Sequence, residues 1–323
     1  MLVPGGAGFI GRHVVLSLLQ HGARVVIGSR DPARSALKLS QAARDCELRS
    51  MRFEKMLDAQ SWRAALGGID TVVNCVGILR SRGAETFERI HHLAPAALAL
   101  ACAQFGVRRL VHVSALGLHA GAKSGFLRSK LNGEAAIRAV DNLDVSIVRP
   151  SLLDGEGGYG ALWLRRVARW PVHFVPADAI GRTAPLDVGD LGEAIARLCT
   201  LADRTDLREV DLGGAHSRTM KEHLAALRRE HGLPEAMCIN VAPQFALLVS
   251  HVCDVLHVTP FSFGHLELMR RDNLPSRDLL AMLLGRTPKA IGRDKPARAA
   301  TEDDDANTSS LGRPTGAERR LGE

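Results

Sequence analysis

The sequence predicts an α/β fold, a doubly wound Rossmann-type parallel sheet with a smaller, mostly helical C-terminal cap and a disordered tail. Three observations lead to this prediction. Short apolar runs alternate with longer helical patterns over the first two thirds of the 323 residues. A glycine-rich segment, Gly5–Gly11, follows the first of these runs. Runs such as Val25–Ile27 and Thr71–Val73 are unbroken, which is typical of strands that helices cover on both faces of a parallel sheet.

The strands and helices of the first half follow from the same patterns. Apolar runs predict six strands: Leu2–Val3, Arg24–Gly28, Leu48–Phe53, Thr71–Cys75, Arg109–Val113 and Val145–Arg149. Helical periodicity predicts four helices between them: Gly11–His21, Ser61–Leu66, Phe87–Phe105 and Ser129–Val140. The first strand is short, and Pro4 has no N–H for a sheet ladder. Residues 1–150 are therefore expected to form a dinucleotide-binding core.

The pattern loosens after Pro150. Gly155–Gly160 is expected to be a loop, Asp190 the N-cap of a helix over Asp190–Leu201, and Val210–Leu212 a late strand. Further helices are predicted over four segments: Trp163–Trp170, Met220–His231, Gln244–Leu256 and His265–Asp272. Residues 151–290 then form a substrate- or partner-binding part interleaved with the core. Residues 291–323 are rich in Pro, Gly, Ala, Asp and Arg, and we expect them to be a disordered tail.

Composition narrows the class of protein. Hydrophobic residues make up 46% of the chain and charged residues 24%, as in ordinary globular proteins. The six cysteines form no close pairs, so the sequence predicts neither a disulfide scaffold nor a metal site. The glycines begin at Gly5 and leave no space for a signal peptide, so we expect a reducing, cytoplasmic location. The net charge of +7 is spread out and aromatic residues make up 4%, which argues against nucleic-acid binding.

The apolar segment Gln244–Leu256 allows two interpretations. It is too short to span a bilayer, so no transmembrane segment is predicted. It is either a buried helix of the cap or a surface that touches lipid or a protein partner.

The glycine motif predicts a phosphate-binding turn. Gly5, Gly8 and Gly11 have the spacing GxxGxxG between the first strand and the first helix. A tight turn there directs the helix N-terminus at a pyrophosphate, and a Cβ would block the approach of the backbone. With Phe9 and Ile10, these glycines are the expected cofactor-binding residues, the alternative being a turn without a ligand.

The end of the second strand predicts which dinucleotide binds. An acidic residue at this point takes the ribose hydroxyls of NAD(H). Here Ser29 and Arg30 stand there, and Asp31 with Pro32 is typical of an N-cap followed by the first helical residue. Because a guanidinium offers paired donors to phosphate oxygens, we expect NADP(H) to be preferred, with NAD(H) also possible. The alternative is that Arg30 stacks on the adenine.

Several motifs carry a family resemblance that covers nearly all of residues 1–290. They are Gly5–Gly11, Gly28–Pro32, Asn74–Gly77, Val111–Gly117, Lys130–Glu134, Arg149–Ser151, Pro185, Asp187, Asp190 and Arg270–Asn273. With these motifs the chain resembles the extended short-chain dehydrogenase/reductase superfamily. It is most similar to the atypical branch that contains the nucleotide-binding accessory subunit of respiratory complex I and its bacterial relatives.

The resemblance implies a site with one altered residue. Active members use a Tyr-x-x-x-Lys pair, in which tyrosine moves a proton and lysine lowers its pKa and holds the nicotinamide ribose. Here Phe126 precedes Lys130 by four residues, so Lys130 is kept and the proton donor is missing. Ser114 is the implied partner serine, or else it only satisfies backbone groups at a strand end. The remaining implied cofactor residues are Asn74, Val76, Gly77 and Pro150.

Two functions follow, from different classes. The first is a nucleotide-binding protein without efficient hydride chemistry, which serves membrane-associated respiratory or quinone-pathway proteins at the inner face of a membrane. The second is an active NADP-dependent oxidoreductase or epimerase that acts on a small or lipid-like substrate. Its substitute proton donor would be Ser114, Tyr159, His119 or a substrate-held water. Whether His91 or His92 faces the cofactor, or both are structural, stays open.

Overall fold

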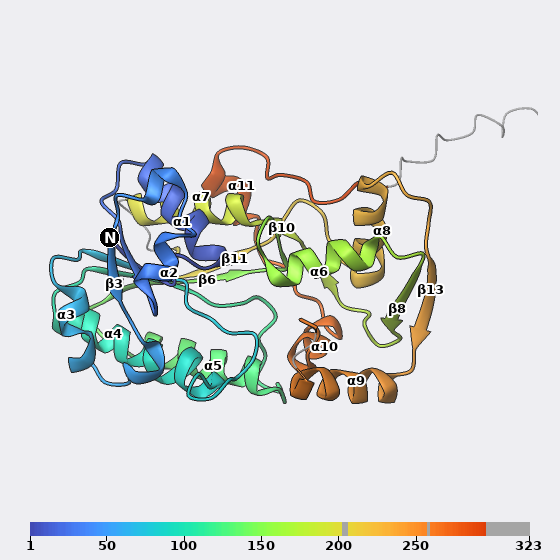
Figure 1. Cartoon of the computed structure of the whole chain (residues 1–323), viewed down its shortest axis with the longest axis horizontal. Coiled ribbons are helices and arrows are strands. Elements are labelled where there is room, and N and C mark those ends of the chain that lie inside the picture. The colour runs from blue at the N-terminus through green and yellow to red at the C-terminus, as the bar shows by residue number, and fades with distance from the viewer. Residues whose placement is uncertain (202–205, 257–258, 295–323) are drawn as a thin grey trace, which may run out of the picture. The chain divides into compact units, whose positions relative to one another are not determined.

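Seven parallel strands form the central sheet of the computed structural model, which describes residues 1–201, 206–256 and 259–294 (Figure 1). Their order across the sheet is β11-β6-β5-β4-β1-β2-β3. The strands are β1 Leu2–Pro4, β2 Val26–Ser29, β3 Glu47–Ser50, β4 Thr71–Asn74, β5 Arg109–Val113, β6 Asp144–Pro150 and β11 Glu209–Leu212. The predicted doubly wound, Rossmann-type parallel sheet is thus confirmed.

Helices cover both faces of the sheet because successive strand residues point to opposite sides. On one face, Val3 and Ile27 pack with the three helices α1 Phe9–Gln20, α7 Val188–Thr200 and α11 Leu279–Leu284. On the other face, their neighbours Leu2 and Val26 pack with α3 Arg63–Leu66, α4 Ala94–Gln104 and α5 Gly125–Arg138. Figure 1 shows these two helical layers above and below the sheet. The central strands β1, β2, β4 and β5 are therefore buried on both sides, as the unbroken apolar runs predict, whereas the edge strand β3 is partly exposed.

The first strand is short, as expected, yet it lies in the middle of the sheet. It has three residues and pairs with β2 on one side and β4 on the other. Pro4 is tolerated because it is the last strand residue and its carbonyl still accepts a hydrogen bond from Cys75 N (3.0 Å).

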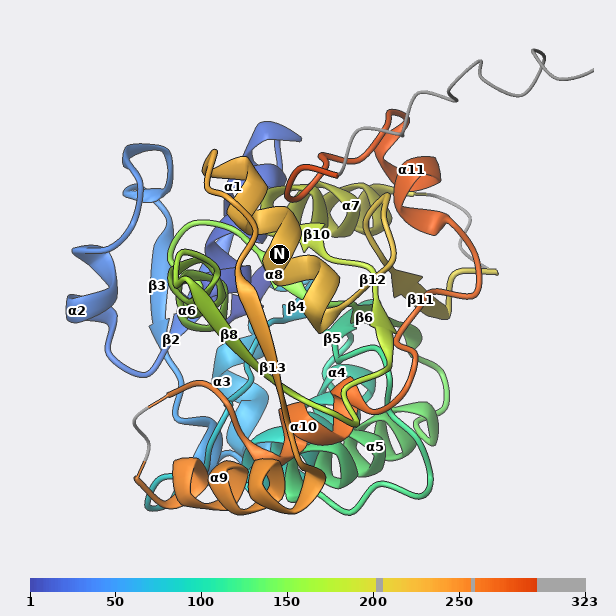
Figure 2. The same cartoon turned by 90° about the vertical axis from the view of Figure 1, so that its right-hand side faces the viewer.

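Elsewhere in the described residues there are five further α-helices and three two-stranded sheets. The helices are α2 Pro32–Ala36, α6 Tyr159–Ala168, α8 Met220–Glu230, α9 Pro243–Leu256 and α10 Phe263–Met269. The strand pairs are β7 Leu153–Asp154 with β10 Leu186–Asp187, β9 Arg182–Thr183 with β12 Arg218–Thr219, and β8 Val172–Pro176 with β13 Met237–Val241. Figure 2 shows β13 leading into α9. Among the described residues, no helix combines the length and apolarity needed to cross a membrane.

Three details of the sequence prediction need correction. The N-cap of α7 is Asp187, which accepts hydrogen bonds from Gly189 N (3.0 Å) and Asp190 N (3.1 Å). Asp190 lies in the first turn instead, where it is fully buried and pairs with Arg286 (2.8 Å). The predicted helix over Phe87–Phe105 is divided into a π-helical turn, Glu88–Leu93, and α4, while the predicted strand over Leu48–Phe53 ends at Ser50.

The first residues of the predicted tail are packed. Ile291 is 7% exposed and lies in a cluster with Val167 and Leu227, and Arg293 N donates to Ala226 O (3.0 Å). An apolar side chain in contact with α6 and α8 explains why this end of the segment is ordered. Residues 295–323, the remainder of the predicted tail, lie outside the described residues.

Candidate functional site

The order of the sheet reverses between β1 and β4, the point at which a Rossmann fold has its ligand crevice. From β1 the chain continues to β2 and β3 on one side, whereas β4 leads to β5, β6 and β11 on the other. In open α/β sheets this switch point, at the carboxyl ends of the strands, is where ligands bind. Gly5 directly follows β1 in a left-handed conformation (φ +74°), and a Cβ there would lie 3.1 Å from both Cys75 and Val76, which follow β4. Glycine is therefore required at the centre of the crevice.

The predicted phosphate turn is built by close backbone contacts. Gly8 N donates to Gly5 O (2.8 Å), and a Cβ on Gly11 would lie 2.1 Å from that same oxygen. Gly8 is the N-cap of α1, and its missing Cβ would meet only Gly5 O, at 3.0 Å. The first N–H groups of a helix have no partner within the helix, so Phe9, Ile10 and Gly11 present donors at an open backbone. This turn fits a pyrophosphate.

A second glycine-rich loop lies against this turn. A Cβ on Gly158 would come within 2.5 Å of the Phe9 ring, so Phe9 packs under this loop. The Arg12 guanidinium donates to the Glu156 carbonyl and lies beside Gly157. The glycines between residues 155 and 160 were predicted only as a loop, and their number was the one sequence signal for this contact.

At the end of β2, the local polar groups are engaged with one another. Ser29 Oγ lies 2.6 Å from Ser35 Oγ and accepts a hydrogen bond from Asp31 N (3.2 Å). Asp31 caps α2, as predicted, by accepting from Arg34 N (3.0 Å). Arg30 extends away from this turn and pairs with Glu85, a residue that the sequence did not single out.

Buried hydrogen bonds shape the exit of β4. Asn74 is fully buried, and its side chain bonds His112 Nδ1 (3.1 Å) and accepts from Val76 N (3.1 Å). His91 Nε2 accepts from Ile78 N (3.1 Å), so of the two candidate histidines it is His91 that supports the segment after Val76 and Gly77. Burial, and next Lys130, lowers the pKa of His112 to about 3. Asn74 and His91 therefore fix the backbone that closes one side of the crevice.

Helix α5 brings Phe126 and Lys130 together. Lys130 is 8% exposed, and its Nζ lies 5.7 Å from the centre of the Phe126 ring. Burial lowers the pKa of Lys130 to about 8, against an opposing effect of Glu134. The Phe126 ring stacks on His265 (centroids 6.1 Å apart) and meets Phe87 edge-on (5.8 Å). The position four residues before the lysine is thus an apolar, aromatic contact.

The predicted residues at the ends of β5 and β6 lie side by side. Leu116 N donates to Pro150 O (3.0 Å), and Ser114 N donates to Val148 O (2.7 Å). The Ser114 hydroxyl is buried and has no hydrogen-bond partner of normal length among the described residues. Burial raises the pKa of Glu134, but the hydrogen bonds and charge of Arg149, together with the nearby Ser114 hydroxyl, outweigh burial and lower the pKa overall. Ser114 therefore faces Glu134.

Two further candidate proton donors differ in their surroundings. Both ring nitrogens of His119 are buried without a hydrogen-bond partner among the described residues, and Nε2 lies 4.0 Å from Glu267 Oε1. Glu267 is held by Lys123 N (2.7 Å) and Ser124 N (2.9 Å), just before α5. Tyr159 begins α6 and is 56% exposed. Of the two, His119 is the one whose polar atoms are buried, and both of these atoms have unused hydrogen-bonding capacity among the described residues.

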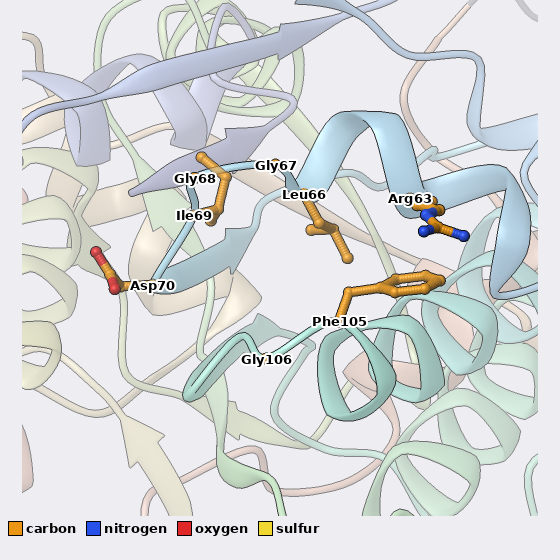
Figure 3. Close-up of a pocket in the computed structure, with 8 residues that line it drawn as sticks. All are labelled: Arg63, Leu66, Gly67, Gly68, Ile69, Asp70, Phe105 and Gly106. Carbon is orange, nitrogen blue, oxygen red and sulfur yellow. The ribbon is translucent and has the colours of Figure 1, made fainter.

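A separate hollow lies at the opposite end of the strands, next to the residues that lead into β4 and β5 (Figure 3). It is lined by the ends of α3 and α4 and by the loop 67–70, with Arg63 and Phe105 on one side. None of the predicted site residues lines it. Within the described part of the chain, no group of three His, Cys, Asp or Glu side chains could hold a metal ion.

The glycine turn, the sheet order and the crevice between β1 and β4 define a dinucleotide-binding protein of the Rossmann class. Residues 5–165 match the family model described as NAD(P)H-binding. The chain belongs to this NAD(P)H-binding family. It therefore binds a nicotinamide nucleotide.

Similar proteins include both enzymes and a respiratory subunit. The chain is 30% identical over 239 residues to a ceramide reductase of Caulobacter vibrioides, covering 70% of this chain and 72% of that protein. It is 32% identical over 153 residues to subunit 9 of the NADH dehydrogenase (ubiquinone) 1 alpha subcomplex of Mus musculus, covering 47% of this chain and 40% of the subunit. The NADPH-dependent quinone oxidoreductase of Escherichia coli has the same fold, with a TM-score of 0.68 at 19% identity over 90% of this chain and 96% of that one.

Proposed function

We propose that this protein binds NADP(H) in preference to NAD(H) and acts as a nucleotide-binding accessory protein, without efficient hydride-transfer chemistry of its own. The observation that carries the proposal is the Phe126 side chain. By its spacing from Lys130 it stands for the proton-donating tyrosine of the Tyr-x-x-x-Lys pair that the resemblance implies, and its ring contacts Phe87, His265 and Lys130. A phenyl ring has no ionisable proton, so the usual acid–base step has no donor there.

The nucleotide pocket is expected to survive this loss. Lys130 can still donate to ribose hydroxyls, and the glycine turn still offers free helix N–H groups. A bound nucleotide stabilises the folded state by a few kcal/mol at about 100 times its Kd, which is reason enough for an accessory protein to keep the site.

An outward apolar face supports attachment to a partner. Helix α9 buries its small side chains, Ala246, Ser250 and Cys253, and exposes most of its large ones. The exposed set is Phe245, Leu248, Val249, Val252, Val255 and Leu256. A helix with its large apolar residues facing outward is typical of an interaction surface. Because one relative is a subunit of NADH dehydrogenase, we propose membrane-associated respiratory or quinone-pathway proteins as partners, and a cytoplasmic position at the inner face of a membrane.

The second candidate is an active NADP-dependent oxidoreductase or epimerase on a small or lipid-like substrate. Two observations favour it. Both ring nitrogens of His119 are buried and unused among the described residues, and the ring lies near the Glu267 carboxylate. The Caulobacter relative is named as a reductase of ceramide, an apolar substrate. In this function His119, oriented by Glu267, would be the substitute proton donor.

A Phe126→Tyr variant distinguishes the two functions. We expect no measurable NADPH oxidation by the wild-type protein with quinone or ceramide-like carbonyl substrates, and a gain of turnover in Phe126→Tyr, since the new hydroxyl would lie near Lys130. Phe87→Tyr, in the same aromatic cluster, is the matched control and should gain nothing. Robust wild-type turnover that falls in His119→Gln would contradict the accessory function and support the second candidate.

A further inference from the structure

The ion pair between Arg30 and Glu85 lies where a Rossmann fold places the adenosine ribose. Arg30 directly follows β2, and its side chain is 65% exposed. Glu85 comes 55 residues later, from the turn between β4 and the π-helix, and its side chain is 23% exposed. The chain thus brings one cation and one carboxylate to the end of β2 from two distant segments.

The geometry of each segment leaves these two charges available. Ser29 and Asp31, the other polar residues at this strand end, bond to Ser35 and to the backbone of α2. Glu85 is held in place by its own backbone, which exchanges two hydrogen bonds with Arg82 (2.9 and 3.0 Å). The carboxylate is therefore on a short, closed turn.

The two charges suit the two forms of the cofactor. A carboxylate accepts hydrogen bonds from the 2′- and 3′-hydroxyls that NAD(H) presents. A guanidinium has five donors, so Arg30 can bind the 2′-phosphate of NADP(H), but that phosphate then stands beside the negative charge of Glu85. An exposed ion pair adds little to the stability of a fold. We therefore expect Arg30 and Glu85 to act in ligand binding.

We propose that Arg30 and Glu85 form a selectivity pair, in which Glu85 supplies from another segment the acidic group that the end of β2 lacks. Glu85 then binds the ribose hydroxyls of NAD(H) and limits, by charge repulsion, the preference that Arg30 gives to NADP(H). This inference rests on the proposed NADP(H) preference. It identifies Glu85 as the residue that determines how large this preference is.

The test is a titration of NADPH and NADH against the full-length protein at low ionic strength. We expect Glu85→Gln to tighten NADPH binding by about five- to tenfold, since a like charge near the phosphate is removed, and to weaken NADH binding. Glu88→Gln is the matched control, because it removes a charge from the same region that pairs with His92 (2.6 Å) and not with Arg30. This control should leave the ratio of the two Kd values unchanged.

Arg30→Gln completes the test. We expect this variant to lose most of its NADPH affinity and to keep its NADH affinity. A Kd ratio that Glu85→Gln does not move, or moves no more than Glu88→Gln does, would overturn the selectivity pair alone. A wild-type protein that binds NADH tenfold more tightly than NADPH, together with an Arg30→Gln variant of unchanged NADPH affinity, would overturn the NADP(H) preference itself.

Discussion

Burial of Lys130 in the nucleotide site is expected to lower the stability of the folded state while it supports nucleotide binding. Its pKa is lowered to about 8 by burial, from 10.5 in an unfolded chain. The folded state thus carries a penalty while the lysine is charged, and this penalty is relieved as the pH rises from 8 to 10.5, because the unfolded state then binds more protons. We expect Lys130→Met to raise the free energy of unfolding at pH 7 by about 1–2 kcal/mol while weakening nucleotide binding strongly.

Chemical denaturation at pH 7 and pH 10, with and without NADPH, checks this prediction. The wild-type protein should gain stability between the two pH values relative to Lys130→Met, which has no titrating group there. A variant that is less stable at pH 7, with nucleotide affinity intact, would mean that Lys130 is a structural residue.

At the scale of elements, α9 carries the partner prediction. Leu248 and Val252 lie one turn apart on its outward face and are 60% and 44% exposed. Replacing both with serine should leave the free energy of unfolding within about 0.5 kcal/mol, because exposed side chains lose little on substitution. The variant should nevertheless lose the respiratory or quinone-pathway proteins that the wild-type protein recovers from its own cells in mild detergent.

Leu162→Ser is the control for this experiment, since Leu162 is 53% exposed on α6. It should recover the same partners as the wild-type protein. Equal recovery by all three proteins would show that α9 is not the attachment surface, and an empty wild-type pull-down would count against the accessory function.

The elements that were predictable from the sequence are those with a long or repetitive signal. Thr71–Asn74 and the glycine turn were found because buried parallel strands and phosphate turns leave distinctive local patterns. By contrast, β13 pairs only with β8, and the six residues of α11 are too few to show a period, so neither was predicted. The N-cap was misplaced because Asp187 and Asp190 are both acceptable caps by residue type.

The site was predictable only where one segment builds it. The glycines from Gly5 to Gly11 are close in the sequence and contact one another in the structure. The same holds for Phe126 and Lys130. Glu85 meets Arg30 across 55 residues, and Glu267 meets Lys123 across 144. Such contacts depend on how the strands are ordered in the sheet, which no local pattern encodes.

At the scale of the whole molecule, buried neutral histidines should make the fold sensitive to acid. Burial lowers the pKa of His112 to about 3 and those of His223 and His265 to about 4. Below pH 6.5 these histidines bind protons in the unfolded chain but not in the folded state. The free energy of unfolding therefore falls as the pH falls. Each such histidine contributes a slope of up to about 1.4 kcal/mol per pH unit between its two pKa values.

His223 allows this slope to be assigned, because it lies in α8, away from the nucleotide crevice, and is 1% exposed. Asp154 partly opposes the effect of burial on its pKa, whereas Arg218 and Arg165 add to it. Urea unfolding between pH 7 and pH 5 should show a steep loss of stability in the wild-type protein, and His223→Leu should reduce the slope by up to one proton. Met220→Leu, in the first turn of the same helix, removes no titrating group and should leave the slope unchanged. If His223→Leu and the wild-type protein lost stability in parallel, His223 would have to be protonated in the folded state, with Asp154 compensating its charge.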